Sequence, residues 1–222
     1  MNLYHYKPQP RDYRQSPAAQ QQLQTRLQAT LDGMSLRGET LADCAIGFAD
    51  EFAPQLHHNR ARLWSVFKDK RRAVNTTRTS QSTFGFYAIQ GQSVLEFMTD
   101  GKAASMALML QSVRRANPDV QRIILFWDNA RAHLDRGVQA LAWSLGIYLV
   151  AVPAYSPNLN PIERVWKSIR RGLSEIGLID SVGSLQAHIK RLFDSLSPSC
   201  SFAKSWIEQM LAPIYELSPI SK

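Results

Sequence analysis

The chain alternates short apolar runs with longer segments of helical periodicity. Three fully apolar runs are typical of strands buried on both faces, namely 44–49, 123–127 and 147–152. Three more segments, rich in aromatic and aliphatic residues, are further strand candidates: 62–67, 83–89 and 94–98. Strands alternate with helical segments over the second half, which predicts parallel pairing there, whereas short links between the earlier strands allow antiparallel pairing.

Apolar residues recur with helical spacing in five segments: 16–33, 102–116, 134–145, 161–173 and 182–196. A segment centred on Trp206 follows. In the first helix Ser16 is the expected N-cap, Pro17 suits the first turn and Gly33 the stop. Its narrow leucine stripe must pack on this domain or on a partner. Together these elements predict an α/β fold with a mixed central sheet flanked by helices.

Composition excludes several classes of protein. The 222 residues are 45% hydrophobic and 20% charged, which excludes disorder as the main state. Two distant cysteines, Cys44 and Cys200, exclude a disulfide scaffold and suit a reducing compartment. The longest apolar run, 147–155, is too short for a membrane span of about twenty residues, and the polar start lacks a signal-peptide pattern. We therefore expect a soluble, intracellular protein.

The distribution of charge predicts a polyanionic partner. Lysine and arginine number 26 against 18 acids, a formal net charge of +8. Seven bases and one acid lie between Arg60 and Arg78, and a second cluster comprises Arg164, Lys167, Arg170 and Arg171. Clustered bases most often bind nucleic acid, although a solvated basic face is the alternative.

Two aspartates directly follow buried strands. Asp50 follows the first apolar run and Asp128 the second. Ligands of open α/β sheets bind outside the carboxyl ends of strands, so both carboxylates are expected there side by side. Such a pair repels unless a proton or cation intervenes, and Mg²⁺ prefers oxygen ligands of this kind. The alternative is that each aspartate only caps the turn after its strand.

Glu163 is the third candidate acid, at the start of a predicted helix. If Asn160 is the N-cap and Pro161 the first helical residue, Glu163 completes a capping box. Glu163 and Lys167 also form a favourable pair four residues apart. Neither arrangement requires the proline-rich turn before the helix, which fixes the direction in which Glu163 points.

Two segments, DNARAH (128–133) and AYSPNLNPIERVW (154–166), resemble the paired signatures of DDE transposases, in the bacterial insertion-sequence branch related to the mariner elements. The 34 residues between Asp128 and Glu163 are the separation that this branch shows, and an apolar strand ending in Asp50-Glu51 resembles its first signature. The motifs span 45–171. Ala154, Trp127 and the stretch at 63–64 depart from the pattern, but no departure removes an acid.

The resemblance implies a ribonuclease-H-like fold and cleavage of DNA phosphodiester bonds. It implies that Asp50, Asp128 and Glu163 are catalytic and hold two Mg²⁺ ions, or Mn²⁺ in their place. Asp50 is preferred to Glu51 because it ends its strand as Asp128 does. Asn129 could orient Asp128 or a metal-bound water, and His133 could contact DNA or a scissile phosphate; the alternatives are a turn former and a solvent-facing histidine, respectively. The expected phosphate contacts are Arg60, Arg62, Lys70, Arg71, Arg72, Lys167, Arg170 and Arg171.

We expect three parts: an N-terminal arm and short helix (1–40), the catalytic domain (41–175) and a C-terminal helical extension (176–222). Family members usually carry an N-terminal DNA-reading region, so the chain resembles a catalytic portion, one frame of a split gene or a truncated copy. Expected partners are double-stranded DNA at element ends and target, a second copy on DNA, and a separate DNA-reading portion. The expected location is the cytoplasm, at the nucleoid. The alternatives are a catalytically idle relic that binds DNA or a full-length transposase, and another metal-dependent nuclease.

Overall fold

A computed structural model describes residues 13–56 and 75–212. Its centre is a mixed five-stranded sheet in the order β3-β2-β1-β4-β5. Both neighbours of β2 pair antiparallel with it, whereas β4 pairs parallel with β1 and β5. The strands are β1 (Cys44–Phe52), β2 (Thr83–Gln90), β3 (Val94–Phe97), β4 (Arg122–Trp127) and β5 (Ile147–Ala151). The predicted mixed α/β sheet is therefore confirmed, while the strand candidate 62–67 lies outside the described residues.

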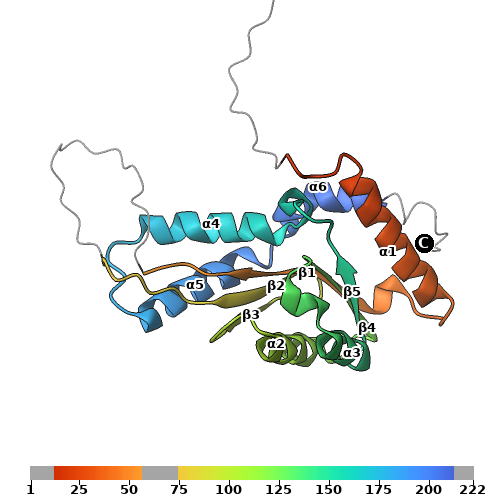
Figure 1. Cartoon of the computed structure of the whole chain (residues 1–222), viewed down its shortest axis with the longest axis horizontal. Helices are drawn as coiled ribbons and strands as arrows, with labels where there is room; N and C mark the ends of the chain where they lie inside the picture. The colour runs from red at the N-terminus through yellow and green to blue at the C-terminus, as the bar shows by residue number, and fades with distance from the viewer. Residues whose placement is uncertain (1–12, 57–74, 213–222) are drawn as a thin grey trace, which may run out of the picture.

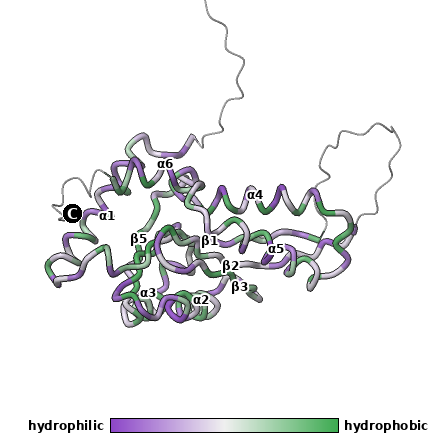
Figure 2. Tube along the Cα trace, turned by 180° about the vertical axis from the view of Figure 1, so that it is seen from behind, coloured by the Kyte–Doolittle hydropathy of each residue, from purple (hydrophilic) through white to green (hydrophobic). Residues whose placement is uncertain are grey.

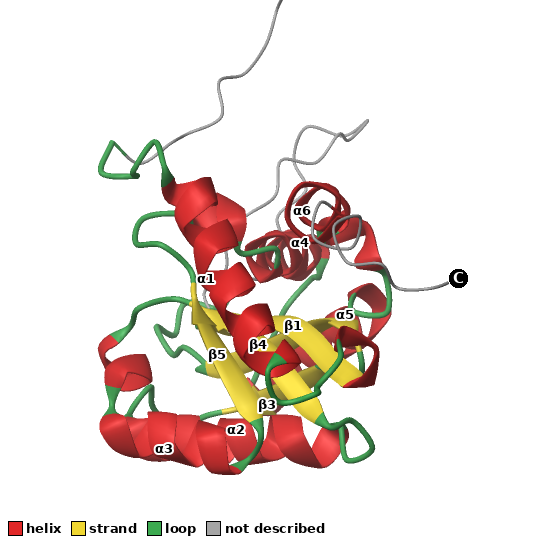
Figure 3. Cartoon of the chain, turned by 90° about the vertical axis from the view of Figure 1, so that its right-hand side faces the viewer, coloured by secondary structure: helices red, strands yellow, loops and turns green. Residues whose placement is uncertain are grey.

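Helices cover both faces of the sheet. One face packs on α2 and α3, and the other on α1, α4 and the C-terminal helices (Figures 1 and 3). Figure 2 shows hydrophobic and hydrophilic residues alternating along α4, as in an amphipathic helix that lies on a core. The helices are α1 (Ala19–Ser35), α2 (Ala103–Ala116), α3 (Arg136–Ser144), α4 (Ile162–Glu175), α5 (Val182–Leu196) and α6 (Lys204–Trp206), which continues as a π-helical turn (Ile207–Leu211).

The alternation of side chains along β1 sorts its residues between two hydrophobic clusters. Ile46 and Phe48 join the cluster under α4, whereas Ala45 and Ala49 join the cluster over α2 and α3. β1 continues beyond the predicted run to Phe52, which is buried beneath α4. Even-numbered residues of β1 therefore face α4, and odd-numbered residues face the opposite layer.

A glycine on β2 lets α4 approach the sheet closely. Trp166 of α4 is buried and stacks on Phe52, with ring centroids 5.0 Å apart and planes within 9°. A Cβ atom at Gly85 would lie 2.4 Å from the Trp166 ring, so only glycine fits there without displacement. Gly85 pairs with Asp50 across β1 and β2. The contact between Gly85 and Trp166, through which α4 packs closely on the sheet, therefore lies directly beside Asp50.

The first helix differs from its prediction at both ends. It begins at Ala19 without a side-chain cap, because the Ser16 hydroxyl accepts from the Ala18 amide just before it. It runs through Gly33 to Ser35, since buried Met34 extends the apolar face by one residue. It packs on this domain, where Arg26 Nη1 donates to the Ala151 carbonyl at the end of β5.

The helix predicted over 134–145 begins two residues later than expected, at Arg136. A 3₁₀ turn (Arg131–Leu134) precedes α3, because the Asp135 carboxylate caps α3 by accepting from the Gly137 and Val138 amides.

In the described residues, no helix is long and apolar enough to cross a membrane. The three-part division of the chain stays a prediction, although α1, α5 and α6 share one hydrophobic cluster with β1 and α4.

Candidate active site

Asp50, Asp128 and Glu163 line one cavity of about 400 Å³. Phe48 of β1 pairs in register with Phe126 of β4, and each aspartate lies two residues beyond its phenylalanine. Both aspartates therefore lie at the same end of the sheet, where they line the same cavity. Glu163 lies in the first turn of α4. The structure thus brings together the three acids that the sequence singled out.

The carboxylates differ in their electrostatic environment. Burial, followed by the charges of Glu163, Glu51 and Asp128, raises the pKa of Asp50 to about 8. Burial also raises the pKa of Glu163; the charge of Arg170 opposes this effect and that of Asp128 adds to it. The hydrogen bond from His133 lowers the pKa of Asp128 against the effect of burial. Without a cation, the cavity therefore retains a proton on Asp50 at neutral pH.

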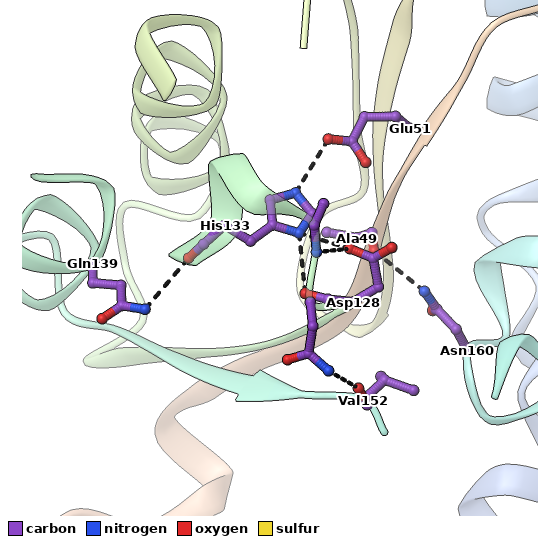
Figure 4. A network of polar contacts seen from close by, with 9 residues as sticks. Ala49, Glu51, Asp128, His133, Gln139, Val152 and Asn160 are labelled. Atoms are coloured by element: carbon purple, nitrogen blue, oxygen red, sulfur yellow. Dashed lines mark hydrogen bonds and ion pairs between the residues drawn. The ribbon is translucent and has the colours of Figure 1, made fainter. Parts of the chain in front are cut away.

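His133 contacts both Asp128 and Glu51 (Figure 4). Its side chain is only 1% exposed, so the solvent-facing alternative is wrong. Its Nδ1 lies 2.8 Å from Asp128 Oδ1, and its Nε2 lies 3.1 Å from Glu51 Oε1. Burial acts to lower the pKa of His133, but the hydrogen bonds to both carboxylates outweigh it and raise the pKa to about 10. The imidazolium also stacks on Trp127, with ring centroids 4.1 Å apart, which explains the bulky residue before Asp128.

Glu51 and Asp50 point to opposite faces of β1. Glu51 contacts His133, which lies on the side of α2 and α3, whereas Asp50 lines the cavity beside α4. The same alternation that sorts the hydrophobic core therefore separates the two neighbouring acids. The placement favours Asp50 as the first acid of the set, as the sequence reasoning preferred.

Asn129 ties the end of β4 to the segment after β5. Its Nδ2 donates to the Val152 carbonyl at 2.9 Å (Figure 4). The Asn129 side chain thus bonds to Val152, a residue of the cavity wall, and not to the Asp128 carboxylate. Asp128 Oδ1 instead accepts from the Ala130 amide. The interpretation of Asn129 as a turn residue is closer to its placement.

The start of α4 contradicts the capping-box interpretation. Pro161 is the cap residue and no side chain caps the helix. Asn160 instead turns its Nδ2 to the Ala49 carbonyl of β1, at 3.3 Å. Glu163 makes no ion pair with Lys167 among the described residues. A tertiary contact has therefore replaced the expected Asn160 cap, and the Glu163 carboxylate lines the cavity.

The turn before α4 forms one wall of the cavity and meets the N-terminal arm. Tyr155 lines the cavity and adopts left-handed backbone, with φ of 57°, which is uncommon for a residue other than glycine. The guanidinium of Arg14 lies 3.9 Å from the Tyr155 ring centroid, and Gln15 Nε2 donates to Asn158 Oδ1 at 2.7 Å. Sequence reasoning assigned Tyr155 to a turn but had no signal for its contact with the arm.

Three of the candidate phosphate contacts lie on α4. Lys167, Arg170 and Arg171 are exposed, and the first two follow Glu163 by four and seven residues, which is helical spacing for one face. A basic stripe therefore extends along α4 from the cavity. The other candidates lie outside the described residues: Arg60, Arg62, Lys70, Arg71 and Arg72.

The donor set fits a hard divalent cation in chemical type and in charge. Mg²⁺ and Mn²⁺ take carboxylate oxygens, and burial together with the charges of Glu163, Glu51 and Asp128 raises the pKa of Asp50, so a cation would favour its ionised form. Within the described ranges, no three acidic, histidine or cysteine side chains are already grouped as a set that could hold an ion. Asp50, Asp128 and Glu163 line one cavity and are the residues that would hold the cation.

A mixed sheet flanked by helices, with acids near the carboxyl ends of two parallel strands and on an adjacent helix, has the architecture of a ribonuclease-H-like fold. The family model of the DDE superfamily endonucleases matches residues 45–186, more than half of the chain, and the chain belongs to this family. No curated protein sequence matches it significantly.

Solved structures of the Mos1 mariner transposase share the fold. A paired-end complex with Mn aligns with a TM-score of 0.66 and 18% identity over 100% of this chain and 69% of that chain. A paired-end complex with the left transposon end aligns with a TM-score of 0.65 and 18% sequence identity over 95% of this chain. This chain spans 64% of that transposase chain. The isolated Mos1 catalytic domain aligns with a TM-score of 0.59 and 18% identity, covering 89% of this chain and 91% of that domain.

Proposed function

We propose that the chain is the catalytic portion of a transposase that moves an insertion sequence by metal-dependent hydrolysis of DNA phosphodiester bonds and by strand transfer. The observation that carries this proposal is the convergence of Asp50, Asp128 and Glu163 on one cavity. Membership of the DDE endonuclease family supports it, as does the fold shared with a transposase solved together with its transposon end.

The side chains in and around the cavity have different roles in the proposed reaction. Asp50, Asp128 and Glu163 would hold two Mg²⁺ ions, or Mn²⁺, and these ions would supply activation of a water or a DNA 3′-hydroxyl as nucleophile and stabilisation of the leaving oxygen. His133 keeps Asp128 ionised and fixes its direction through the Nδ1 contact. The turn that includes Tyr155 forms part of the cavity wall.

Basic residues hold the DNA by its phosphates. The stripe of Lys167, Arg170 and Arg171 leads from the cavity along α4, and the arginines and lysines of 60–72 add charge next to β1 in sequence. Such contacts are independent of base sequence and weaken steeply with salt. We propose that two copies act together on DNA, since two element ends must be joined, and that a separate N-terminal portion reads those ends. The proposed location is the cytoplasm, at the nucleoid.

The test is cleavage of supercoiled plasmid and of duplexes that carry element ends, with and without Mg²⁺ or Mn²⁺. Nicking that requires the metal and is lost in Asp128→Ala, Asp50→Asn and Glu163→Gln supports the proposal. Asp119→Asn is the matched control: it removes an exposed carboxylate outside the cavity and should retain the activity.

The products distinguish the remaining candidates. Joining of element ends to target DNA identifies a transposase, whereas nicking alone identifies another metal-dependent nuclease. Absence of any cleavage by folded wild-type protein with both metals contradicts the proposal and returns the idle relic as the explanation.

A further inference from the structure

Asn160 bonds both to the strand that carries Asp50 and to the helix that carries Glu163. Its Nδ2 donates to the Ala49 carbonyl at 3.3 Å, and this carbonyl belongs to the peptide group whose nitrogen is that of Asp50. Its own backbone carbonyl accepts from the Glu163 amide at 3.1 Å. Figure 4 shows the side-chain bond reaching from the start of α4 across to β1. One residue therefore links the backbones of two acids that are more than a hundred positions apart.

Packing alone does not account for an asparagine at this position. The residue is 4% exposed and lies beside the fully buried Ile162. Its Oδ1 is buried without a hydrogen-bond partner in the described part of the chain. A buried acceptor without a partner lowers stability, and an apolar residue of similar shape avoids this loss. The amide donor toward Ala49 is thus the property that distinguishes asparagine from leucine here.

We propose that Asn160 is a positioning residue that sets the separation between Asp50 and Glu163, and with it the affinity of the cavity for its divalent cations. It lines the same cavity as the acids, but it acts through their backbones and not by contact with DNA. Loss of an outer hydrogen bond that orients metal-binding residues typically weakens metal affinity or activity by about 10- to 100-fold. The inference rests on the proposed metal-dependent function of the cavity.

The experiment compares Asn160→Leu and Asn160→Ala with the wild-type protein. Mn²⁺ affinity is measured by calorimetric titration, at a temperature where circular dichroism shows every variant folded, and plasmid nicking is measured in parallel. Asn158→Leu is the matched control, because Asn158 is exposed on the same turn and bonds to Gln15 instead of β1.

We expect both Asn160 variants to bind Mn²⁺ about tenfold or more weakly and to nick more slowly, with partial recovery of nicking at high Mn²⁺. The leucine variant should melt at the wild-type temperature or above in EDTA, and the control should match wild type throughout. Unchanged Mn²⁺ affinity in the folded Asn160 variants overturns the inference. Failure of wild-type protein to bind Mn²⁺ or to nick overturns the proposed function instead, so the two failures are distinguishable.

Discussion

Replacing Asp50 by asparagine is expected to stabilise the metal-free protein while abolishing cleavage. The Asp50 carboxyl is partly buried among other carboxylates, which raises its pKa to about 8 from the ordinary 3.8. Between these two pH values the folded state holds a proton that the unfolded chain has released. Stability therefore falls as the pH rises from about 4 to about 8, and asparagine, which carries no charge, escapes this loss.

The size of the effect follows from the pKa difference. A pKa of about 8 against 3.8 corresponds to roughly 5 to 6 kcal/mol, at about 1.36 kcal/mol for each pH unit. Asp50 keeps some contact with solvent, which screens its neighbours, so we expect about 2 to 3 kcal/mol at mildly alkaline pH. At mildly acidic pH the stabilisation should be much smaller, because the folded and unfolded carboxyl groups are then closer in protonation.

The assay is urea unfolding in EDTA at acidic, neutral and alkaline pH. Wild type, Asp50→Asn and Asp119→Asn are compared, the last being an exposed aspartate outside the cavity. Adding Mg²⁺ should stabilise wild type and leave Asp50→Asn little changed. A stability difference that does not vary with pH, or an asparagine variant that is less stable than wild type at alkaline pH, would refute the reasoning.

Three further predictions concern the scaffold and the pH dependence. Glu39→Gln should lower the free energy of unfolding by about 1 to 3 kcal/mol at neutral pH, because buried Glu39 accepts from Arg122 at 2.7 Å. Hydrogen bonds lower the pKa of Glu39 against the effect of burial, so this difference should fade as the pH drops, and a constant difference in urea titrations would contradict it. Gly85→Ala should cost about 1 to 3 kcal/mol and slow nicking by displacing Trp166 and α4; unchanged melting and nicking would refute this. At limiting Mg²⁺, nicking should rise with pH toward about 8 as Asp50 loses its proton, and a flat profile would exclude this titration.

Local patterns predicted the sheet well because buried strands and amphipathic helices have distinct periodicities. The sequence also predicted that Asp50 and Asp128 lie together, because each directly follows a buried strand. In the structure each lies two residues beyond a phenylalanine of the pair Phe48 and Phe126, so both lie at one end of the sheet. The first family signature left the choice between Asp50 and Glu51 open. The continuation of β1 to Phe52 and its alternation provide the signal that separates them.

The interactions that the sequence did not reveal are those with distant partners. Asn160 has the ideal residue type and spacing for a helix cap, but the Ala49 carbonyl, 111 positions away, competes for its amide. His133 looks like a surface residue at a helix start, yet Glu51 and Asp128 enclose it. Neither contact leaves a trace in local periodicity, because each depends on which elements become neighbours in the folded chain.

The order in which the three acids occur along the chain has a consequence for synthesis on the ribosome. Asp50 emerges long before Asp128, and the two become neighbours only when β4 pairs with β1 across more than 70 intervening residues. Glu163 follows on α4, whose Trp166 rests on Phe193 of the still later α5. A nascent chain therefore carries separated carboxylates until α4 has emerged, and the cavity that they line forms only after β4 has paired with β1 and α4 has packed on the sheet.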